Sequence, residues 1–199
     1  MSSAPPRPDW KTPRIWADSG AKEPAACALV SLGDVARDQG RFDVAQARFE
    51  EAREASRSLD ESHFEIGPPT FNLGLLALDR GDLETAAGEF RSALELFERD
   101  GRSFFAATSH LGLAAVASGR IEPALCKEHA EAALAGLRGF GFYHRDVLAM
   151  AVRTVRGPGA RDQRELWTLV LAQAMGLGDE AIAAEARTAW FSARTPQAP

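Results

Sequence analysis

Cys126 and His129 are the residues whose types and spacing come closest to a chemical site. They lie three positions apart, which on a helix places a thiol and an imidazole on one face, as in half of a zinc site. Zinc needs three or four ligands, and no second Cys/His pair accompanies this one; Cys27 is distant in sequence. The spacing therefore favours a buried thiol beside an exposed histidine over a metal centre, and we expect no cofactor.

No other pattern supplies catalytic groups. The motifs HExxH, GxSxG and GxxxxGK[ST] do not occur, and the glycines at 136, 139 and 141 follow a predicted helix, whereas a phosphate loop follows a strand. Acidic residues are spread along predicted helix surfaces, and nothing brings a nucleophile, a base and an orienting group together. The sequence predicts a protein that is not an enzyme and has no catalytic residue.

Composition and charge limit the remaining classes of function. The chain has 199 residues, of which 45% are apolar and 26% charged, enough for one well-cored domain. Its net charge of −5 and its scattered basic residues do not give the clustered basic surface that nucleic-acid binding needs. No stretch approaches the roughly 20 apolar residues that insert into a membrane. Two cysteines and an N-terminus without a signal-peptide core favour the cytoplasm.

Helical periodicity runs through most of the chain. Residues 83–97 show it best, because their apolar residues fall three or four positions apart and the glutamates take the other face. Residues 1–22 differ, since their prolines favour an extended or disordered arm. Trp10 and Trp16 in this arm either dock on the body or bind a partner. Residues 196–199 are expected to fray.

An internal repeat organises the helical part. Three segments share the pattern L-G-x-x-A-x-x-x-G, at 32–40, 73–81 and 111–119. An alanine recurs five positions after the second glycine of each segment, at Ala45, Ala86 and Ala124. The second glycine can end a first helix in the left-handed conformation, and small residues let two antiparallel helices approach closely. We therefore expect the glycines at 33, 74 and 112 and the three alanines to be points of close contact between helices.

This pattern resembles the tetratricopeptide repeat family, in which a Leu-Gly pair is followed by a later alanine, an aromatic residue and an alanine. Phe49 and Phe90 supply the aromatic residue in the first two copies, and Glu128 falls at its place in the third. The resemblance implies an all-α fold, a right-handed α-solenoid of stacked antiparallel helical hairpins. It implies one domain over residues 23–195, with units at about 26–59, 67–100, 105–138 and a degenerate fourth at 163–194.

In the resembled family, the first helix of each hairpin lines a concave groove that binds a partner. Distance from the Leu-Gly pair assigns the groove residues of this chain, which are Arg37, Phe71, Asn72, Leu75, Ser109, His110 and Leu113. Asn72 would hydrogen-bond the backbone of an extended peptide, or alternatively a neighbouring helix or water. Phe71 and Leu75 would alternatively belong to the core. Lysine is absent from these positions, which disfavours recognition of a C-terminal carboxylate.

The leading hypothesis is a non-catalytic adaptor or assembly subunit that binds a protein or peptide in this groove. The alternative is a regulatory protein that senses a short peptide or small ligand, and the least favoured is the metal-dependent enzyme using Cys126 and His129. Self-association through a terminal helix carrying Trp190 and Phe191 is a further possibility.

Overall fold

The structure, a computed structural model, describes residues 22–57, 66–137, 145–157, 168 and 180–192. Within these ranges the backbone is α-helical apart from short turns, and no strand occurs. The helices are α2 (Lys22–Asp38), α3 (Phe42–Arg57), α4 (Gly67–Arg80), α5 (Leu83–Arg99), α6 (Ser103–Gly119), α7 (Pro123–Leu137), α8 (Arg145–Arg156) and α10 (Glu180–Ser192).

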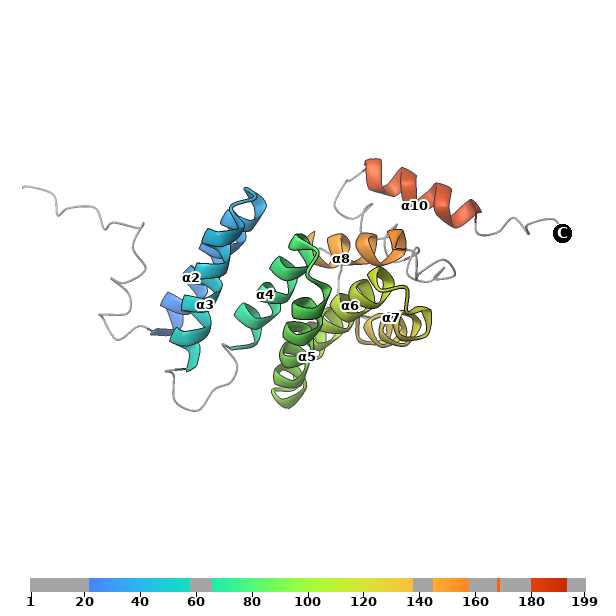
Figure 1. Cartoon of the computed structure of the whole chain (residues 1–199). Coiled ribbons are helices and arrows are strands. Elements are labelled where there is room, and N and C mark those ends of the chain that lie inside the picture. The colour runs from blue at the N-terminus through green and yellow to red at the C-terminus, as the bar shows by residue number, and fades with distance from the viewer. Residues whose placement is uncertain (1–21, 58–65, 138–144, 158–167, 169–179, 193–199) are drawn as a thin grey trace, which may run out of the picture.

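The first six of these helices form three hairpins stacked in a row (Figure 1). Helix α2 pairs with α3, α4 with α5 and α6 with α7. Each later hairpin packs its first helix on the second helix of the hairpin before it, α4 on α3 and α6 on α5. The first helices α2, α4 and α6 also touch one another along the row. This arrangement confirms the α-solenoid that the repeat predicts.

Left-handed residues end the first helices of the first two hairpins. Gly40 has φ of 70° and Gly81 has φ of 78°, values that cost a residue without a Cβ little. The amide of each glycine donates to a carbonyl three residues earlier, and the next amide donates to one five residues earlier. These bonds satisfy carbonyls that the end of a helix leaves free. Asp82 then caps the start of α5: its carboxylate accepts a 3.0 Å hydrogen bond from the Thr85 amide, and its bonds to Thr85 lower its pKa.

Each second helix buries four residues at one repeated spacing, and α5 buries Ala87 in addition. Counted along each helix, these residues lie four, three and four positions apart, and every one of them is fully buried: Ala45, Phe49, Ala52 and Ser56 in α3; Ala86, Phe90, Ala93 and Phe97 in α5; Cys126, Ala130, Ala133 and Leu137 in α7. This spacing keeps them on one helix face. It shows that all three hairpins use the same packing surface.

The third hairpin has a different register from the one that its Leu-Gly pair predicts. The expectation that Ala124 is a point of close contact is wrong, because Ala124 is exposed and Cys126 takes its place in the core. Helix α6 continues to Gly119, and the left-handed position falls on Ile121, with φ of 61°. Ile121 makes the same turn hydrogen bonds as Gly40 and Gly81.

This two-residue shift changes what the glycine at 112 contacts. A Cβ at Gly74 would lie 2.8 Å from the ring of Phe90 in its own hairpin, and a Cβ at Gly112 would lie 2.8 Å from the same ring, in the preceding hairpin. Gly112 is therefore a close-contact point, as expected, but against the neighbouring unit. Counting seven residues back from Ile121, as from Gly81 to Gly74, places Ala114 at the position that glycine has in the first two hairpins.

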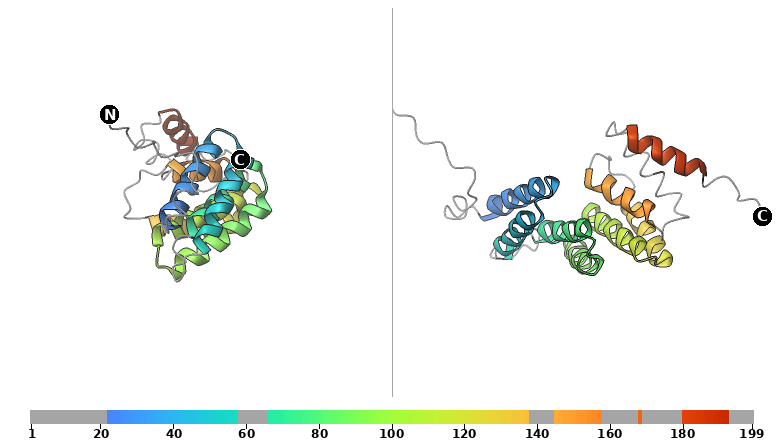
Figure 2. Two further views of the ribbon diagram at one scale, coloured as in Figure 1. Left: turned by 90° about the vertical axis from the view of Figure 1, so that its left-hand side faces the viewer. Right: turned by 45° about the horizontal axis from the view of Figure 1, so that its top comes forward.

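Helix α8 follows the row of first helices α2, α4 and α6, but it does not pack on the second helix of the hairpin before it. It packs on α6 and makes no comparable contact with α7, although α4 and α6 each rest on the preceding second helix (Figure 2). The Ser118 hydroxyl donates a 2.7 Å hydrogen bond to the Thr154 carbonyl, and Gly157 packs against the Ser118 side chain. Five described apolar residues of α8 join the main core, as do Ala183 and Ala186 of α10.

Some expectations lie outside the described residues. They concern the N-terminal arm with its two tryptophans, most of the first half of the degenerate unit at 163–194, the side chains of Trp190 and Phe191, and the tail at 196–199. Among the helices that the structure describes, none combines the length and the apolar character that crossing a membrane requires.

Candidate functional site

A strip of polar residues joins the first helices α2 and α4. The Asn72 amide nitrogen donates a 3.0 Å hydrogen bond to the Asp34 carboxylate, and the Arg37 Nε lies 3.8 Å from the Asp79 carboxylate. We call Asp34, Arg37, Asn72 and Asp79 the inner polar strip. Two members, Asn72 and Asp79, lie seven residues apart on α4 and so face the same side of that helix. The strip therefore follows the seam between two neighbouring repeats.

Helix α8 extends this strip. Arg153 forms an ion pair and hydrogen bond with the Asp79 carboxylate, from a position 74 residues further along the chain. The Asp79 carboxylate thus forms ion pairs with Arg37 of α2 and with Arg153 of α8. Because partly buried charge pairs are screened less by salt than exposed ones, these contacts help to hold α8 near α4.

Most of the residues assigned to the predicted groove are buried within the chain. Phe71 is 8% exposed, and its ring centroid lies 5.5 Å from that of Phe90 and 6.5 Å from that of Phe97. Leu75 and Leu113 are also buried in this core. The fully buried Ser109 donates a 3.0 Å hydrogen bond to the Phe105 carbonyl of its own helix. In this conformation the four side chains contribute to packing.

Asn72 and Arg37 both lie on the seam between α2 and α4, where they contact Asp34 and Asp79 respectively. Asn72 is only 7% exposed, and its amide bonds a neighbouring helix, which was the alternative interpretation of this residue. The side chain of Arg37 is 12% exposed. Their binding of a partner stays a prediction, and it applies to the seam between α2 and α4.

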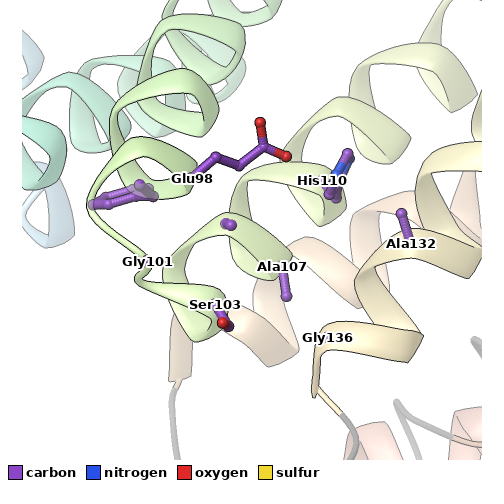
Figure 3. A pocket seen from close by; sticks show the side chains of 9 residues that line it. Glu98, Gly101, Ser103, Ala107, His110, Ala132 and Gly136 are labelled. Atoms are coloured by element: carbon purple, nitrogen blue, oxygen red, sulfur yellow. The ribbon is translucent and has the colours of Figure 1, made fainter.

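His110 lies apart from these residues. It lines a cavity of about 300 Å³ between α5, α6 and α7, together with Phe97, Glu98, Gly101, Ser103, Ala106, Ala107, Ala132 and Gly136 (Figure 3). We call this cavity the α5–α7 groove. The register shift explains the position of His110, since the two-residue offset turns residues of α6 by about 200° around a helix with 3.6 residues per turn. Small residues form most of the wall.

His110 and His129 form a histidine pair at this groove. Their Nδ1 atoms are 3.1 Å apart, within the range of a hydrogen bond in which one neutral ring donates and the other accepts. Burial lowers the pKa of His110, against the opposing effect of Glu98 and Glu128. Burial and the neighbouring His110 lower the pKa of His129. Burial of both rings, and the effect of His110 on His129, therefore favour neutral imidazoles at pH 7.

Cys126 and His129 have no third metal ligand beside them among the residues that the structure describes. Cys126 is fully buried against α6, where burial raises the pKa of its thiol, and the His129 ring turns to His110. Over the described ranges, no group of three or more His, Cys, Asp or Glu side chains could hold a metal ion.

A second cavity lies between α3, α4 and α5, and we call it the α3–α5 groove. Its lining comes from the end of α4 and the start of α5, whereas that of the α5–α7 groove comes from the end of α5 and the start of α6. Among its lining carboxylates, Glu89 lies 3.1 Å from the Arg53 Nη1, and Asp82 accepts hydrogen bonds from Thr85. Arg80, also in the lining, lies 2.8 Å from the carboxylate of Asp43, outside it.

Sequence patterns missed the histidine pair, the role of Asp79 and the carboxylate of Glu98. The histidines are 19 positions apart and the Asp79–Arg153 pair 74 apart, so no local spacing indicates either contact. Glu98 lines the α5–α7 groove beside residues of α6 and α7. Its neighbours there depend on the observed register of the third hairpin, which the sequence pattern did not predict.

Comparisons with known proteins agree with this architecture. The family described as "Tetratricopeptide repeat" matches residues 24–99. No curated protein matches the chain. Among solved structures, the crystal structure of BtubC (BKLC) from P. vanneervenii is similar, with a TM-score of 0.59 and 16% sequence identity over 93% of this chain and 86% of that one. That similarity shows a shared fold. The match covers the first two of the stacked hairpins, so residues 24–99 belong to the tetratricopeptide repeat family.

Proposed function

We propose that this chain is a non-catalytic adaptor or assembly subunit that binds a protein or peptide partner along the inner polar strip. The repeat family generally mediates protein–protein interaction. The observation that carries the proposal is the continuous seam of first helices, on which Asp34, Arg37, Asn72 and Asp79 place hydrogen-bonding groups from two repeats side by side. An extended segment needs such groups at regular intervals, because each of its peptide units offers a donor and an acceptor.

The chemistry of the strip suits an exchange of partners. The Asn72 amide donates to Asp34 in the unbound chain, and a partner's backbone carbonyl would accept the same hydrogen bond. The exposed residues Ser31 and Val35 lie on the same helix as Asp34 and offer further contact area at its edge. Neither Cys27 nor Cys126 is in a disulfide, which fits a reducing compartment and so a cytoplasmic location.

Two matched double variants test which surface binds. Arg37→Ala with Asn72→Ala removes polar contacts between α2 and α4, and Arg53→Ala with Glu89→Ala removes one between α3 and α5. Each variant and the wild-type chain would be used to capture partners from an extract, with bound proteins identified by mass spectrometry. We expect the first double variant to lose a partner that the second retains.

The opposite pattern, or equal recovery with both variants, would remove the inner polar strip from the proposal. Failure of the wild-type chain to enrich any protein over a scrambled-surface control would contradict the adaptor function itself. Circular dichroism of both variants checks that they fold equally.

The α5–α7 groove favours the alternative function, a regulatory protein that senses a short peptide or small ligand. Its volume of about 300 Å³ is at the lower end of the range for small-ligand sites. A ligand present at about 100 times its dissociation constant would stabilise the fold by roughly 2.7 kcal/mol. A thermal-shift screen of short peptides would detect such a ligand, and no shift across the screen would contradict this function.

A further inference from the structure

One face of α2 is exposed, although the same face of the later first helices is buried. We count back from the left-handed residue that follows each first helix. The fifth and eighth positions, all at most 7% exposed, are then Leu76 and Leu73 in α4, and Val116 and Leu113 in α6. In α2 the same positions are Val35, which is 50% exposed, and Leu32, which is half-buried. We call Leu32 and Val35, with the exposed Ser31 beside them, the open face of α2.

In the later hairpins this face is covered by the helix that comes before it in the chain. Leu73 and Leu76 of α4 share a buried cluster with Ala45 and Phe49 of α3. The position of Ser31, nine before the left-handed residue, is occupied by Gly112 in α6, where a Cβ would lie 2.8 Å from the Phe90 ring of α5. Helix α2 packs on α3 and α4, which both follow it, and stands at the end of the row (Figure 1). By the construction of the other two hairpins, the chain before α2 belongs on the open face.

The N-terminal arm, residues 1–21, has the apolar groups and the length to reach this face. Trp10, Ile15 and Trp16 stand among prolines and polar residues. Burial of a tryptophan ring removes a large apolar surface from water. Trp16 is six residues before Lys22, a reach of about 20 Å in an extended chain, and Val35 lies about 20 Å along α2 from Lys22. The Trp16 ring can therefore contact any part of the open face.

A second copy of the chain fits this face less well. Where hairpins stack, an arginine just before the left-handed residue pairs with an acidic residue in the first turn of the preceding second helix: Arg80 with Asp43, and Arg120 with Glu84. The arginine position in α2 is Gln39, and the acidic position in α7 is Ala124. The open face is also small, and a tethered segment avoids most of the translational and rotational entropy that a separate chain loses on binding. Size and charge therefore both favour the chain's own arm.

We propose that the N-terminal arm binds across the open face of α2, with the Trp16 ring against Leu32 and Val35. The prolines at 5, 6, 8 and 13 favour an extended arm there, since proline inside a helix removes a hydrogen bond. Asp34 of the inner polar strip lies between Leu32 and Val35 in sequence, so the bound arm borders the strip. A partner that contacts Ser31 and Val35 must then displace the arm. This inference goes beyond the proposed function and does not depend on it.

Fluorine NMR of the full chain, labelled with 5-fluorotryptophan, tests the proposal. The variants Trp10→Phe and Trp16→Phe assign the two signals of the arm. A peptide of residues 1–21 with the same label gives the position of each signal in an unbound arm. In the full chain we expect the Trp16 signal to lie away from its peptide position, and to stay there on dilution because the contact forms within one chain.

Two matched variants assign the contact to the open face. Val35→Glu places a charge on this face and should return the Trp16 signal to its peptide position. Val44→Glu is the control, because Val44 is 41% exposed on α3, outside the open face, and should leave the signal unchanged. Val35→Ser removes apolar surface without adding a charge and should move the signal part of the way. Circular dichroism checks that all three variants fold as the wild type does.

A Trp16 signal at its peptide position in the wild-type chain would overturn the proposal, as would equal responses to Val35→Glu and Val44→Glu. A signal that returns to the peptide position on dilution would also overturn it, because a second copy would then be the occupant. Partner capture by the inner polar strip is a separate measurement, and none of these results decides it.

Discussion

Replacing Ile121 with glycine should make the fold more stable. Ile121 has φ of 61°, a left-handed conformation in which the Cβ of an L-residue approaches a backbone oxygen, at a cost of about 1–2 kcal/mol. Glycine avoids this contact but loses more backbone freedom on folding, which costs about 0.5–1 kcal/mol. The isoleucine side chain is 65% exposed, so its removal sacrifices little burial. The difference is a gain of about 0.5–1 kcal/mol in the free energy of unfolding.

Thermal and urea denaturation followed by circular dichroism would measure this gain. For a chain of this size we expect the melting temperature of Ile121→Gly to rise by about 1–3 °C. Ile121→Ala is the control, because it removes the same side chain and keeps the left-handed strain. Gly81→Ala, at the equivalent turn of the second hairpin, should lose about 1 kcal/mol. A glycine variant no more stable than the alanine variant would refute the assignment of strain to Ile121.

Three further predictions concern packing, reactivity and pH. Gly74→Ala should lower the free energy of unfolding by about 1–3 kcal/mol, because its Cβ would lie 2.8 Å from the buried ring of Phe90. Gly88→Ala, in open space on α5, should raise it by up to about 1 kcal/mol, and chemical denaturation would measure both. In the native chain, iodoacetamide should modify the exposed Cys27 and spare the buried Cys126 until urea unfolds the protein, as peptide mass spectrometry would show. Both rings of the histidine pair have a folded-state pKa below the unfolded value of about 6.5, so the unfolded state binds more protons and stability should fall as the pH drops from 7 to 5. Replacing both histidines with asparagine should remove most of this loss, and an unchanged pH profile would contradict it.

The first two hairpins follow the sequence closely, because every local signal agrees there. Gly40 and Gly81 end their first helices in the left-handed conformation that only glycine adopts easily, and the buried alanine follows five residues later. Phe49 and Phe90 then fill the space against the first helix. Helix type, turn position and core residues were all predictable from these spacings.

The third hairpin could not be placed from its Leu-Gly pair, because two signals conflict. Gly119 resembles a helix-ending glycine, yet the left-handed residue is Ile121, which sequence preferences disfavour there. Tertiary packing decides the register, because a left-handed residue at Ile121 puts Cys126 and Leu137 into the core positions that Ala86 and Phe97 occupy in α5. The repeated four-three-four spacing of buried residues was present in the sequence and is the better guide.

The site was less predictable than the fold. Distances from a misplaced Leu-Gly pair assigned His110 to the inner groove, and the structure places it in the α5–α7 groove. One of the two partners of Asp79, Arg153, comes from α8, a helix that the repeat pattern does not include. Contacts between side chains so far apart in sequence depend on how neighbouring hairpins stack, and that information is not local.

Hydrogen exchange on the full chain, with and without a captured partner, tests the central claim most directly. If a polypeptide binds along the seam of first helices, backbone amides of α2 and α4 should exchange more slowly in the complex, and those of α3 should change least. Protection confined to α3 and α10, or no protection in any stacked hairpin, would contradict the claim that this repeat array holds its partner along that seam.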